Sequence, residues 1–292
     1  MMMVSLCMCA QDMSPEDVFN LISKAEQGDA NAQYYLGVMY FFGRGVEIDK
    51  SMAVEWFRKA AEQGHASAQN NLGAAYANGN GVAKDETKAV EWYRKAAIQN
   101  DAHAQFNLGW MYENGRGVEK DEAKAVEWFR KSAEQGNDLA QSYLGRCYAK
   151  GNGIAKDEAK AVEWFRKSAE QGNVNGQLYL GYYYAKGIGV AKDEAKAVEW
   201  YRKAGEQGEA QAYNSIAYIE AKKGNYDEAI ADIDKAIQLK PNAPNYYDSK
   251  GEFLFKKGDK DGAKAMWDKV ISLDPKFGEM GSELYKLLFP SK

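Results

Sequence analysis

The chain has 292 residues, of which 45% are hydrophobic and 27% are charged, and its formal net charge is -4. This composition predicts a folded protein, and the acidic pI of about 5.5 argues against a nucleic-acid-binding protein, which needs a broad basic face. No apolar run approaches the roughly 18 residues of a membrane-spanning helix, so no transmembrane segment is expected.

The first ten residues, Met1–Ala10, are uncharged and mostly apolar, and a polar segment follows them at once. They resemble the end of a secretory signal peptide cleaved after Ala10, although the positively charged start of such a peptide is absent. We therefore expect residues 1–13 to be either the signal-peptide remnant of an exported protein, periplasmic or secreted, or the disordered end of a cytoplasmic one. Lipidation of Cys9 is a less favoured interpretation, because Met8 is bulkier than the small residue expected before a lipidated cysteine.

Residues 14–29 predict a single helix that caps the N-terminal end of the fold. Ser14 is a suitable N-cap, and Pro15 suits the first turn of a helix. Asn20 stands where the repeats that follow carry tryptophan, as expected for an end that faces water.

From Ala30 onward a sequence pattern repeats with a period of 36 residues. Its constant features are a tryptophan, a glutamine and a Leu-Gly pair, and a fixed period of this length is the signature of a solenoid of stacked units. The tryptophans are Trp56, Trp92, Trp128, Trp164 and Trp200.

Each copy of the pattern predicts two helices. In the second copy, Ala68, Leu72 and Tyr76 recur every four residues on one helical face. Gly73, beside Leu72, leaves room for the close approach of a neighbouring helix. The apolar stripe that follows, which contains Trp92, Tyr93 and several alanines, predicts the second helix, and we expect the tryptophans to pack in the core.

A Gly-x-Gly loop joins the two helices of each copy. In the second copy we expect Gly79 to end the first helix in the left-handed conformation, Gly81 to allow a tight turn, and Asp85 to cap the second helix. Gly-x-Gly pairs also occur in phosphate-binding loops. Here the pair follows a helix and the P-loop pattern is incomplete, so we assign it a structural role.

After Glu209 the period shortens to 34 residues, which is the spacing of Pro241 and Pro275, and the Gly-x-Gly loop is lost. Two further helix pairs are expected over 210–275. The segment 276–292 is expected to form a C-terminal capping helix.

The motif A-x-A-Q-x-x-L-G-x-x-Y-x-x-G-x-G-V-x-x-D-x-x-K-A-V-E-W-[FY]-R-K-A-A resembles the Sel-one-like repeat family, with five copies over residues 30–209. The segment 210–275 resembles two tetratricopeptide repeats. The resemblance implies an all-α fold, a right-handed α-solenoid superhelix of antiparallel helix pairs. It also implies a non-enzymatic scaffold or adaptor that binds a protein segment or peptide in the concave groove.

Some cysteine-rich relatives in this family are described as beta-lactamases or penicillin binders. The alternative function is therefore a cell-envelope carbohydrate or peptidoglycan binder, or a beta-lactamase-like hydrolase. This chain lacks paired cysteines in its repeats and has no S-x-x-K, S-D-N or K-T-G motif of the serine enzymes. Its two histidines, His65 and His103, have no metal-site spacing. We expect no catalytic residue, no cofactor and no metal site.

The resemblance also places the partner-binding residues, because the first helix of a tetratricopeptide unit lines the concave surface with its second, fifth, ninth, twelfth and thirteenth positions. Aromatic and guanidinium groups at the ninth position, and amides and ammonium groups at the thirteenth, suit a peptide with carboxylates. The alternative for the lysines is that they only complement the helix dipole and keep the surface soluble. The ninth positions supply Trp110, Arg146, Tyr182 and Tyr218, and the thirteenth supply Asn78, Asn114, Lys150, Lys186 and Lys222.

The first copy is unusually aromatic, with Tyr34, Phe41 and Phe42 in addition to its core positions. We expect this patch either to hold the N-terminal helix in place or to mediate self-association.

Overall fold

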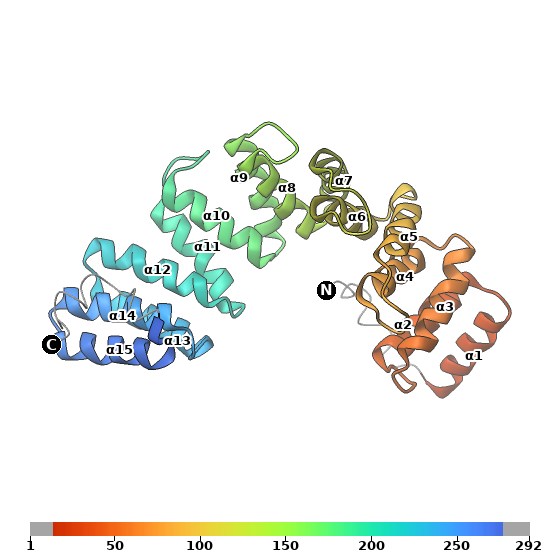
Figure 1. Cartoon of the computed structure of the whole chain (residues 1–292), viewed down its shortest axis with the longest axis horizontal. Coiled ribbons are helices and arrows are strands. Elements are labelled where there is room, and N and C mark those ends of the chain that lie inside the picture. Colours follow the sequence, from red (N-terminus) through yellow and green to blue (C-terminus); the bar gives the residue numbers. More distant parts are fainter. Residues whose placement is uncertain (1–13, 277–292) are drawn as a thin grey trace. The chain divides into compact units, whose positions relative to one another are not determined.

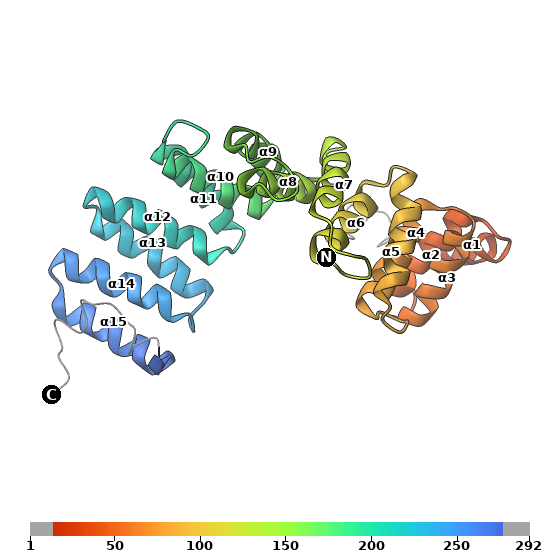
Figure 2. The ribbon, with the colours of Figure 1, turned by 45° about the horizontal axis from the view of Figure 1, so that its top comes forward.

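The computed structural model describes residues 14–276, and every regular element in this range is an α-helix (Figures 1 and 2). The chain divides into two compact units, with the division between Asp157 and Glu158. Within the described range no helix is long and apolar enough to span a membrane. The predictions for Met1–Ala10 and, apart from its first residue, for the C-terminal capping helix lie outside the described residues.

In each unit every helix packs against the next one along the chain, which confirms the predicted all-α stack of helix pairs. The first unit contains α1 (Pro15–Glu26), α2 (Ala30–Phe42), α3 (Lys50–Glu62), α4 (Ala66–Asn78), α5 (Glu86–Ile98), α6 (Ala102–Asn114), α7 (Glu122–Glu134) and α8 (Asp138–Lys150). The second contains α9 (Glu158–Glu170), α10 (Val174–Lys186), α11 (Glu194–Glu206), α12 (Ala210–Lys223), α13 (Tyr226–Leu239), α14 (Pro244–Lys257) and α15 (Lys260–Leu273).

The helix ends follow the predicted capping chemistry. The Asp85 side chain accepts a hydrogen bond from the backbone N–H of Lys88 at 3.0 Å and so caps α5. Gly79 ends α4 with a φ of 71°, in the left-handed region where a residue with a Cβ is strained. Asp121 and Asp193 cap α7 and α11 in the same way as Asp85 caps α5.

From the second repeat onward, the second glycine of the Gly-x-Gly loop marks a contact with the preceding repeat. A Cβ on Gly81 would lie 2.1 Å from the carbonyl oxygen of Lys50, the first residue of α3 in the preceding repeat. Gly117 approaches the carbonyl of Glu86 equally closely. The glycine is therefore needed because one backbone passes over another, and not only because the turn is tight.

The glycine of the Leu-Gly pair faces an aromatic ring of the second helix of its own repeat at Gly37, Gly73, Gly109 and Gly181. A Cβ on Gly73 would lie 2.8 Å from the ring of Tyr93, so the glycine makes the space that this ring fills. Tyr93 is 4% exposed, and its equivalents Phe57 and Phe129 are 1% and 0% exposed. The core aromatic of each repeat is thus the residue after the tryptophan.

The tryptophans themselves are only half-buried, which corrects the expectation that they fill the core. The Nζ of Lys95 lies 3.9 Å from the ring centroid of Trp92, and the same pairing recurs in each of the five second helices from α3 to α11. Trp56 packs beside Ala25 and Leu36 where α1 meets the first repeat. The indole therefore combines packing between helices with a cation–π contact at the surface.

The repeated glutamines form a chain of hydrogen bonds from one repeat to the next. The Nε2 of Gln69 on α4 donates to the carbonyl of Ala61 at the end of α3, at 3.0 Å. Its Oε1 accepts from Nε2 of Gln99 at 2.8 Å. In the second unit Gln207 donates to Gln177 at 2.9 Å. Each buried glutamine thereby satisfies its polar atoms while joining three helices.

This chain of glutamines stops where the shorter repeats begin. Tyr213 on α12 stands at the repeat position of Gln177, and Gly205 on α11 stands at that of Ala169. A Cβ on Gly205 would lie 2.8 Å from the Tyr213 ring, so the glycine accommodates the larger residue. The junction of the two repeat types is thus made by a matched pair of changes.

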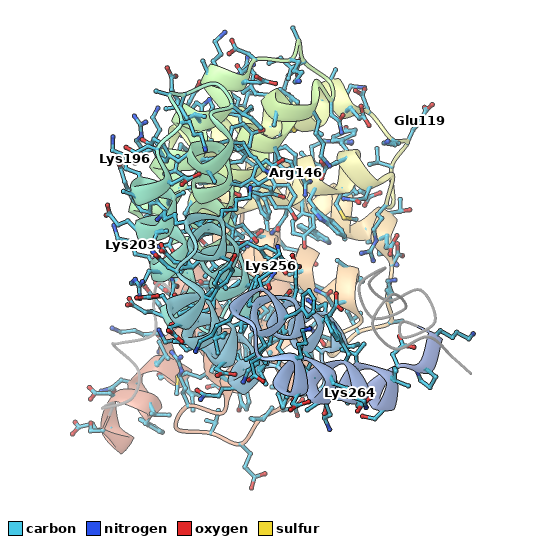
Figure 3. The ribbon with its side chains drawn as sticks, turned by 90° about the vertical axis from the view of Figure 1, so that its left-hand side faces the viewer. Glu119, Arg146, Lys196, Lys203, Lys256 and Lys264 are labelled. Carbon is cyan, nitrogen blue, oxygen red and sulfur yellow. The ribbon has the colours of Figure 1, made fainter. Side chains whose placement is uncertain are left out.

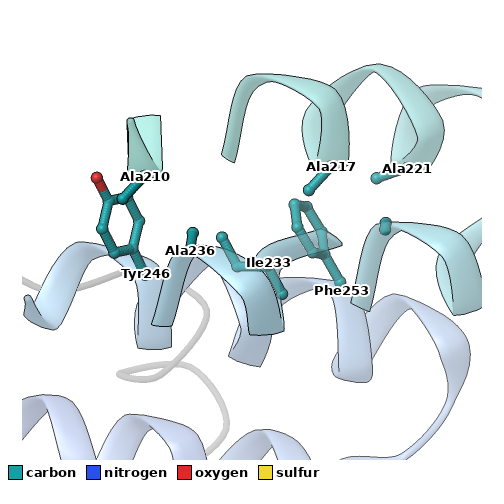
Figure 4. Packing of buried hydrophobic residues seen from close by; sticks show 8 residues of the cluster. Ala210, Ala217, Ala221, Ile233, Ala236, Tyr246 and Phe253 are labelled. Carbon is teal, nitrogen blue, oxygen red and sulfur yellow. The ribbon is translucent and has the colours of Figure 1, made fainter. Parts of the chain in front are cut away.

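Beyond this junction the second unit has a conventional apolar core. Ala217 and Ala221 on α12 face Ile233 on α13 and Phe253 on α14, as Figure 4 shows. Ile233 and Phe253 are fully buried, and each removes apolar surface from water, which stabilises the fold by about 2–3 kcal/mol per side chain. This packing holds α12 in place, and α12 carries two of the predicted binding residues, Tyr218 and Lys222.

Candidate functional site

The candidate residues lie on what we call the first-helix face, the second, fifth, ninth, twelfth and thirteenth positions of the first helix in each repeat. In the first unit its aromatic centre is Trp110 on α6, which is half-buried. The guanidinium of Arg116 lies 5.0 Å from the ring centroid of Trp110, and Nε of Arg116 donates to Glu86 at 2.9 Å. This interaction, together with Lys84, lowers the pKa of Glu86 to about 2. Trp110 therefore lies beside a fixed ion pair.

The two predicted asparagines of this unit are turned back onto their own helices. Asn78 donates to the carbonyl of Ala74, and Asn114 donates to that of Trp110, both at 2.8 Å. Each side chain remains exposed, and its amide oxygen can accept a hydrogen bond from a bound partner.

Arg146 on α8, labelled in Figure 3, already has a carboxylate partner within the chain. Its guanidinium donates to both oxygens of Glu113, at 2.8 and 2.9 Å, and lies 4.2 Å from the ring centroid of Tyr143. A carboxylate from a bound protein would have to share this group with Glu113. Lys150, at the end of the same helix, is exposed.

The aromatic patch of the first repeat is partly occupied by its own neighbours. Tyr34 stacks on His65 with ring centroids 4.7 Å apart, and Phe41 contacts Phe42 edge to face at 5.2 Å. Phe42 is 37% exposed. Self-association through Tyr34, Phe41 and Phe42 stays a prediction.

In the second unit a pocket of about 360 Å³ opens between α10, α11 and α12. This volume lies at the lower end of the range for ligand sites, roughly 300–1,000 Å³. Four of the predicted residues line it, Tyr182 and Lys186 from α10 and Tyr218 and Lys222 from α12. The structure thus brings together the ninth and thirteenth positions of two successive repeats.

The two tyrosines are the exposed aromatic surface of this pocket, 45% exposed for Tyr182 and 37% for Tyr218. The ring of Tyr218 meets that of Phe253 edge to face at 5.1 Å, and its hydroxyl shares a hydrogen bond with Ser249 at 3.2 Å. Burial raises the pKa of Tyr218, so the hydroxyl stays protonated. Tyr218 therefore offers a rigid contact surface.

The charge in the pocket is positive. Lys186, Lys192 and Lys222 line it together with a single carboxylate, that of Glu194. Lys192 is 2.7 Å from Glu194, and its hydrogen bond is the main cause that lowers the pKa of this glutamate, with Lys222 adding to it. Lys192 therefore has a carboxylate partner, whereas the ammonium groups of Lys186 and Lys222 are available to an anionic ligand.

Asn214 on α12 is the residue of this pocket with unsatisfied hydrogen bonding. It lines the pocket and is 8% exposed, and its side-chain Oδ1 is buried without a partner among the described residues. Buried polar groups are nearly always paired, so such an atom in a pocket indicates a ligand or water that completes it.

Asn214 was not predicted as a site residue, although its fifth position in the repeat is one that the tetratricopeptide pattern exposes. Lys192 and Tyr201, also in the pocket, lie outside the first helices and were missed as well. The exchange of Gln177 for Tyr213 was the signal that could have drawn attention to this junction. The predicted residues of the first unit do not belong to the pocket.

The remaining chemistry of the described residues is sparse. No group of three histidine, cysteine or acidic side chains within 14–276 could hold a metal ion. Cys147 is buried, and this burial raises the pKa of its thiol to about 12, which suits a core residue rather than a nucleophile.

Family comparisons agree with the repeat boundaries. The Sel1 repeat profile matches residues 30–65, 66–101, 102–137, 138–173 and 174–209. Tetratricopeptide repeat profiles match residues 210–243 and 244–277. No curated protein gives a significant match to the chain.

Two solved structures share both fold and sequence with the chain. The first is c5321, a protective antigen present in uropathogenic Escherichia coli strains that displays an SLR fold, with 36% identity over 90% of this chain and a TM-score of 0.79. The match spans 58% of the length of that chain. The second is a Sel1 repeat protein from Oxalobacter formigenes, with 34% identity over 74% of this chain and 88% of the other, and a TM-score of 0.62.

Proposed function

Because the chain belongs to the Sel1 repeat family and continues into two tetratricopeptide repeats, we propose that it is a non-enzymatic adaptor that binds a segment of another protein on its first-helix face. Repeat proteins of this kind generally serve as protein-interaction scaffolds. Their first helices present side chains that vary between repeats while the packing residues stay constant.

The observation that carries this proposal is the pair of exposed tyrosines in the pocket of the second unit. Tyr182 and Tyr218 come from successive repeats and line one pocket, with Lys186 and Lys222 beside them. Large aromatic side chains with little conformational freedom are typical anchors of protein interfaces, and an exposed aromatic cluster loses water-accessible surface when a partner covers it.

The test uses a display library of random extended peptide segments and the immobilised full-length chain. Wild type should retain a specific set of segments, and the double variant Tyr182→Ala, Tyr218→Ala should lose at least about tenfold in affinity for them. Leu239→Ala is the matched control, because Leu239 is 43% exposed in the same unit but does not line the pocket.

Melting curves of all variants establish that they are folded. Failure of the wild type to retain any segment contradicts the proposal, and so does unchanged binding by a folded double-tyrosine variant.

The first unit is tested separately with Trp110→Ala. This change is preferred to a substitution of Arg146, whose removal would leave Glu113 without its ion-pair partner. If the first-helix face of this unit also binds the segment, Trp110→Ala lowers affinity while the melting temperature changes little.

A further inference from the structure

The pocket between α10, α11 and α12 contains an unsatisfied amide, two lysines that form no ion pair among the described residues, and two exposed aromatic rings. We propose that it binds an acidic side chain of an extended peptide segment, with Lys186 and Lys222 pairing with the carboxylate and Asn214 bonding to the peptide group beside it. This inference rests on the proposed function and specifies the ligand at one site.

Asn214 is the observation that points to a peptide group. A carboxamide carries one acceptor and one two-proton donor, which match the N–H and C=O of a backbone amide. Its Oδ1 is buried without a partner in the described residues, so an N–H from the ligand would supply the missing hydrogen bond. A ligand with only acceptor atoms would leave this oxygen unpaired.

The lysines point to the charge of the ligand. Lys186 and Lys222 are both exposed, and within the described range neither lies within ion-pair distance of a carboxylate, in contrast to Lys192, which contacts Glu194. A carboxylate that enters the pocket gains charge-assisted hydrogen bonds in a site partly removed from water.

A single carboxylate fits better than a doubly charged group such as a phosphate. Lys186 lies in the last turn of α10 and Lys222 in the last turn of α12, where the helix dipole places partial negative charge. The partial negative charge at each helix end already offsets part of the positive charge of the nearby ammonium group. The arginines that favour phosphate are absent from the pocket lining.

The tyrosines define what lies next to the acidic residue. The rings of Tyr182 and Tyr218 provide apolar surface on the two helices that also carry the lysines. We therefore expect an apolar or aromatic residue beside the acidic one in the bound segment.

The test compares two display libraries against the full-length chain, one with random segments embedded between flanking residues and one with free C-terminal carboxyl groups. The embedded library should yield segments enriched in Asp or Glu at one position. The double variant Lys186→Gln, Lys222→Gln should lose this enrichment. Lys260→Gln, Lys269→Gln makes the same charge change on α15, away from the pocket, and should retain it.

A selected segment is then synthesised with its acidic residue or with the matching amide. Wild type should bind the acidic form at least about tenfold more tightly, and the double-lysine variant should not distinguish the two. Asn214→Leu should weaken both forms equally. Leucine has the same branched shape as asparagine and removes the unpartnered Oδ1, so this change should not lower the melting temperature. A purely structural role for Asn214 predicts a lower melting temperature.

The outcomes separate the two proposals. If wild type retains segments without an acidic preference, or the preference survives in the double-lysine variant, this inference is wrong and the proposed function stands. Enrichment only in the free-carboxyl library also overturns it, because a chain terminus then occupies the pocket. If wild type retains no segment at all, the proposed function itself fails.

Discussion

Gln69 accepts a hydrogen bond from Gln99 and donates one to the carbonyl of Ala61, so a single side chain joins the second helices of two consecutive repeats. Gln69 is 5% exposed, while Gln99 is exposed. The same pair of positions is linked in the first repeat, where Gln63 donates to Gln33. The glutamine of the repeat motif is therefore an interface residue between repeats.

Replacing Gln69 with methionine should lower the free energy of unfolding by about 1–3 kcal/mol, because the buried hydrogen bonds are lost at nearly constant volume. Gln27→Met is the control, because Gln27 is exposed and its side chain donates to the hydroxyl of Ser23 in an exposed hydrogen bond. It should cost less than about 1 kcal/mol. Urea unfolding followed by tryptophan fluorescence measures both values. Equal losses in the two variants would show that burial of Gln69 does not matter.

Gly81→Ala should be far more destabilising than Gly64→Ala. Both glycines have positive φ, 72° and 94°, so each substitution costs about 1–2 kcal/mol of backbone strain. A Cβ on Gly64 meets nothing within 4 Å, whereas one on Gly81 would lie 2.1 Å from the carbonyl oxygen of Lys50. Gly81→Ala must therefore also push two repeats apart. Similar unfolding free energies for the two variants would contradict this account.

The stability of the first unit should fall as the pH is lowered through the range of histidine. Neutral His65 caps α4 by accepting from the backbone N–H of Ala68 at 3.1 Å, and burial lowers its pKa below the usual 6.5. The unfolded chain takes up the proton first. The stabilisation is therefore complete above pH 6.5 and is lost as the pH falls from there toward the lower pKa of the folded state.

Thermal melts at pH values of about 7.5 and 5.5 test this, since they lie on either side of the ordinary histidine pKa. His65→Asn keeps a capping side chain, as Asn137 and Asn173 do in later repeats, and should reduce the loss. His103→Asn changes an exposed histidine, and the loss of stability at low pH should remain in this variant. A wild-type loss that persists unchanged in His65→Asn would contradict the assignment.

Cys147 should react slowly with thiol reagents in the folded protein. It is 3% exposed, and its pKa of about 12 leaves almost no thiolate at neutral pH. With Cys7 and Cys9 replaced by serine, labelling by a maleimide should be slow in buffer and fast in concentrated urea. Rapid labelling in buffer would show that α8 opens readily in the native state.

The sequence predicted the repeat boundaries, the helix pairs and the helix caps because these depend on local chemistry that recurs five times. It placed both Trp92 and Tyr93 on the buried face, whereas only Tyr93 is fully in the core. Trp92 and Tyr93 both lie near the centre of the apolar stripe, and only the contact between Tyr93 and Gly73 decides which ring enters the space. A contact between two helices is not visible in the periodicity of either one.

The candidate site was also predicted in part. Its ninth and thirteenth positions identified Tyr182, Lys186, Tyr218 and Lys222, which the structure brings together in one pocket. Asn214 was missed because its significance depends on an absent hydrogen-bond partner, which no sequence pattern reports. Arg146 was predicted as a partner-binding group, and only the structure shows its ion pair with Glu113.

The contact of Gly205 with Tyr213 also bears on how such a chain can change length. Sel1 repeats meet through the same glutamine and glycine partners, so unequal recombination that removes or duplicates one 36-residue unit rebuilds an equivalent interface. The Gly205–Tyr213 contact has no such equivalent in the five Sel1 repeats and stays with the boundary between the repeat types. Gene rearrangement can therefore alter the number of Sel1 repeats while the pocket beside this boundary keeps its place next to the C-terminal repeats.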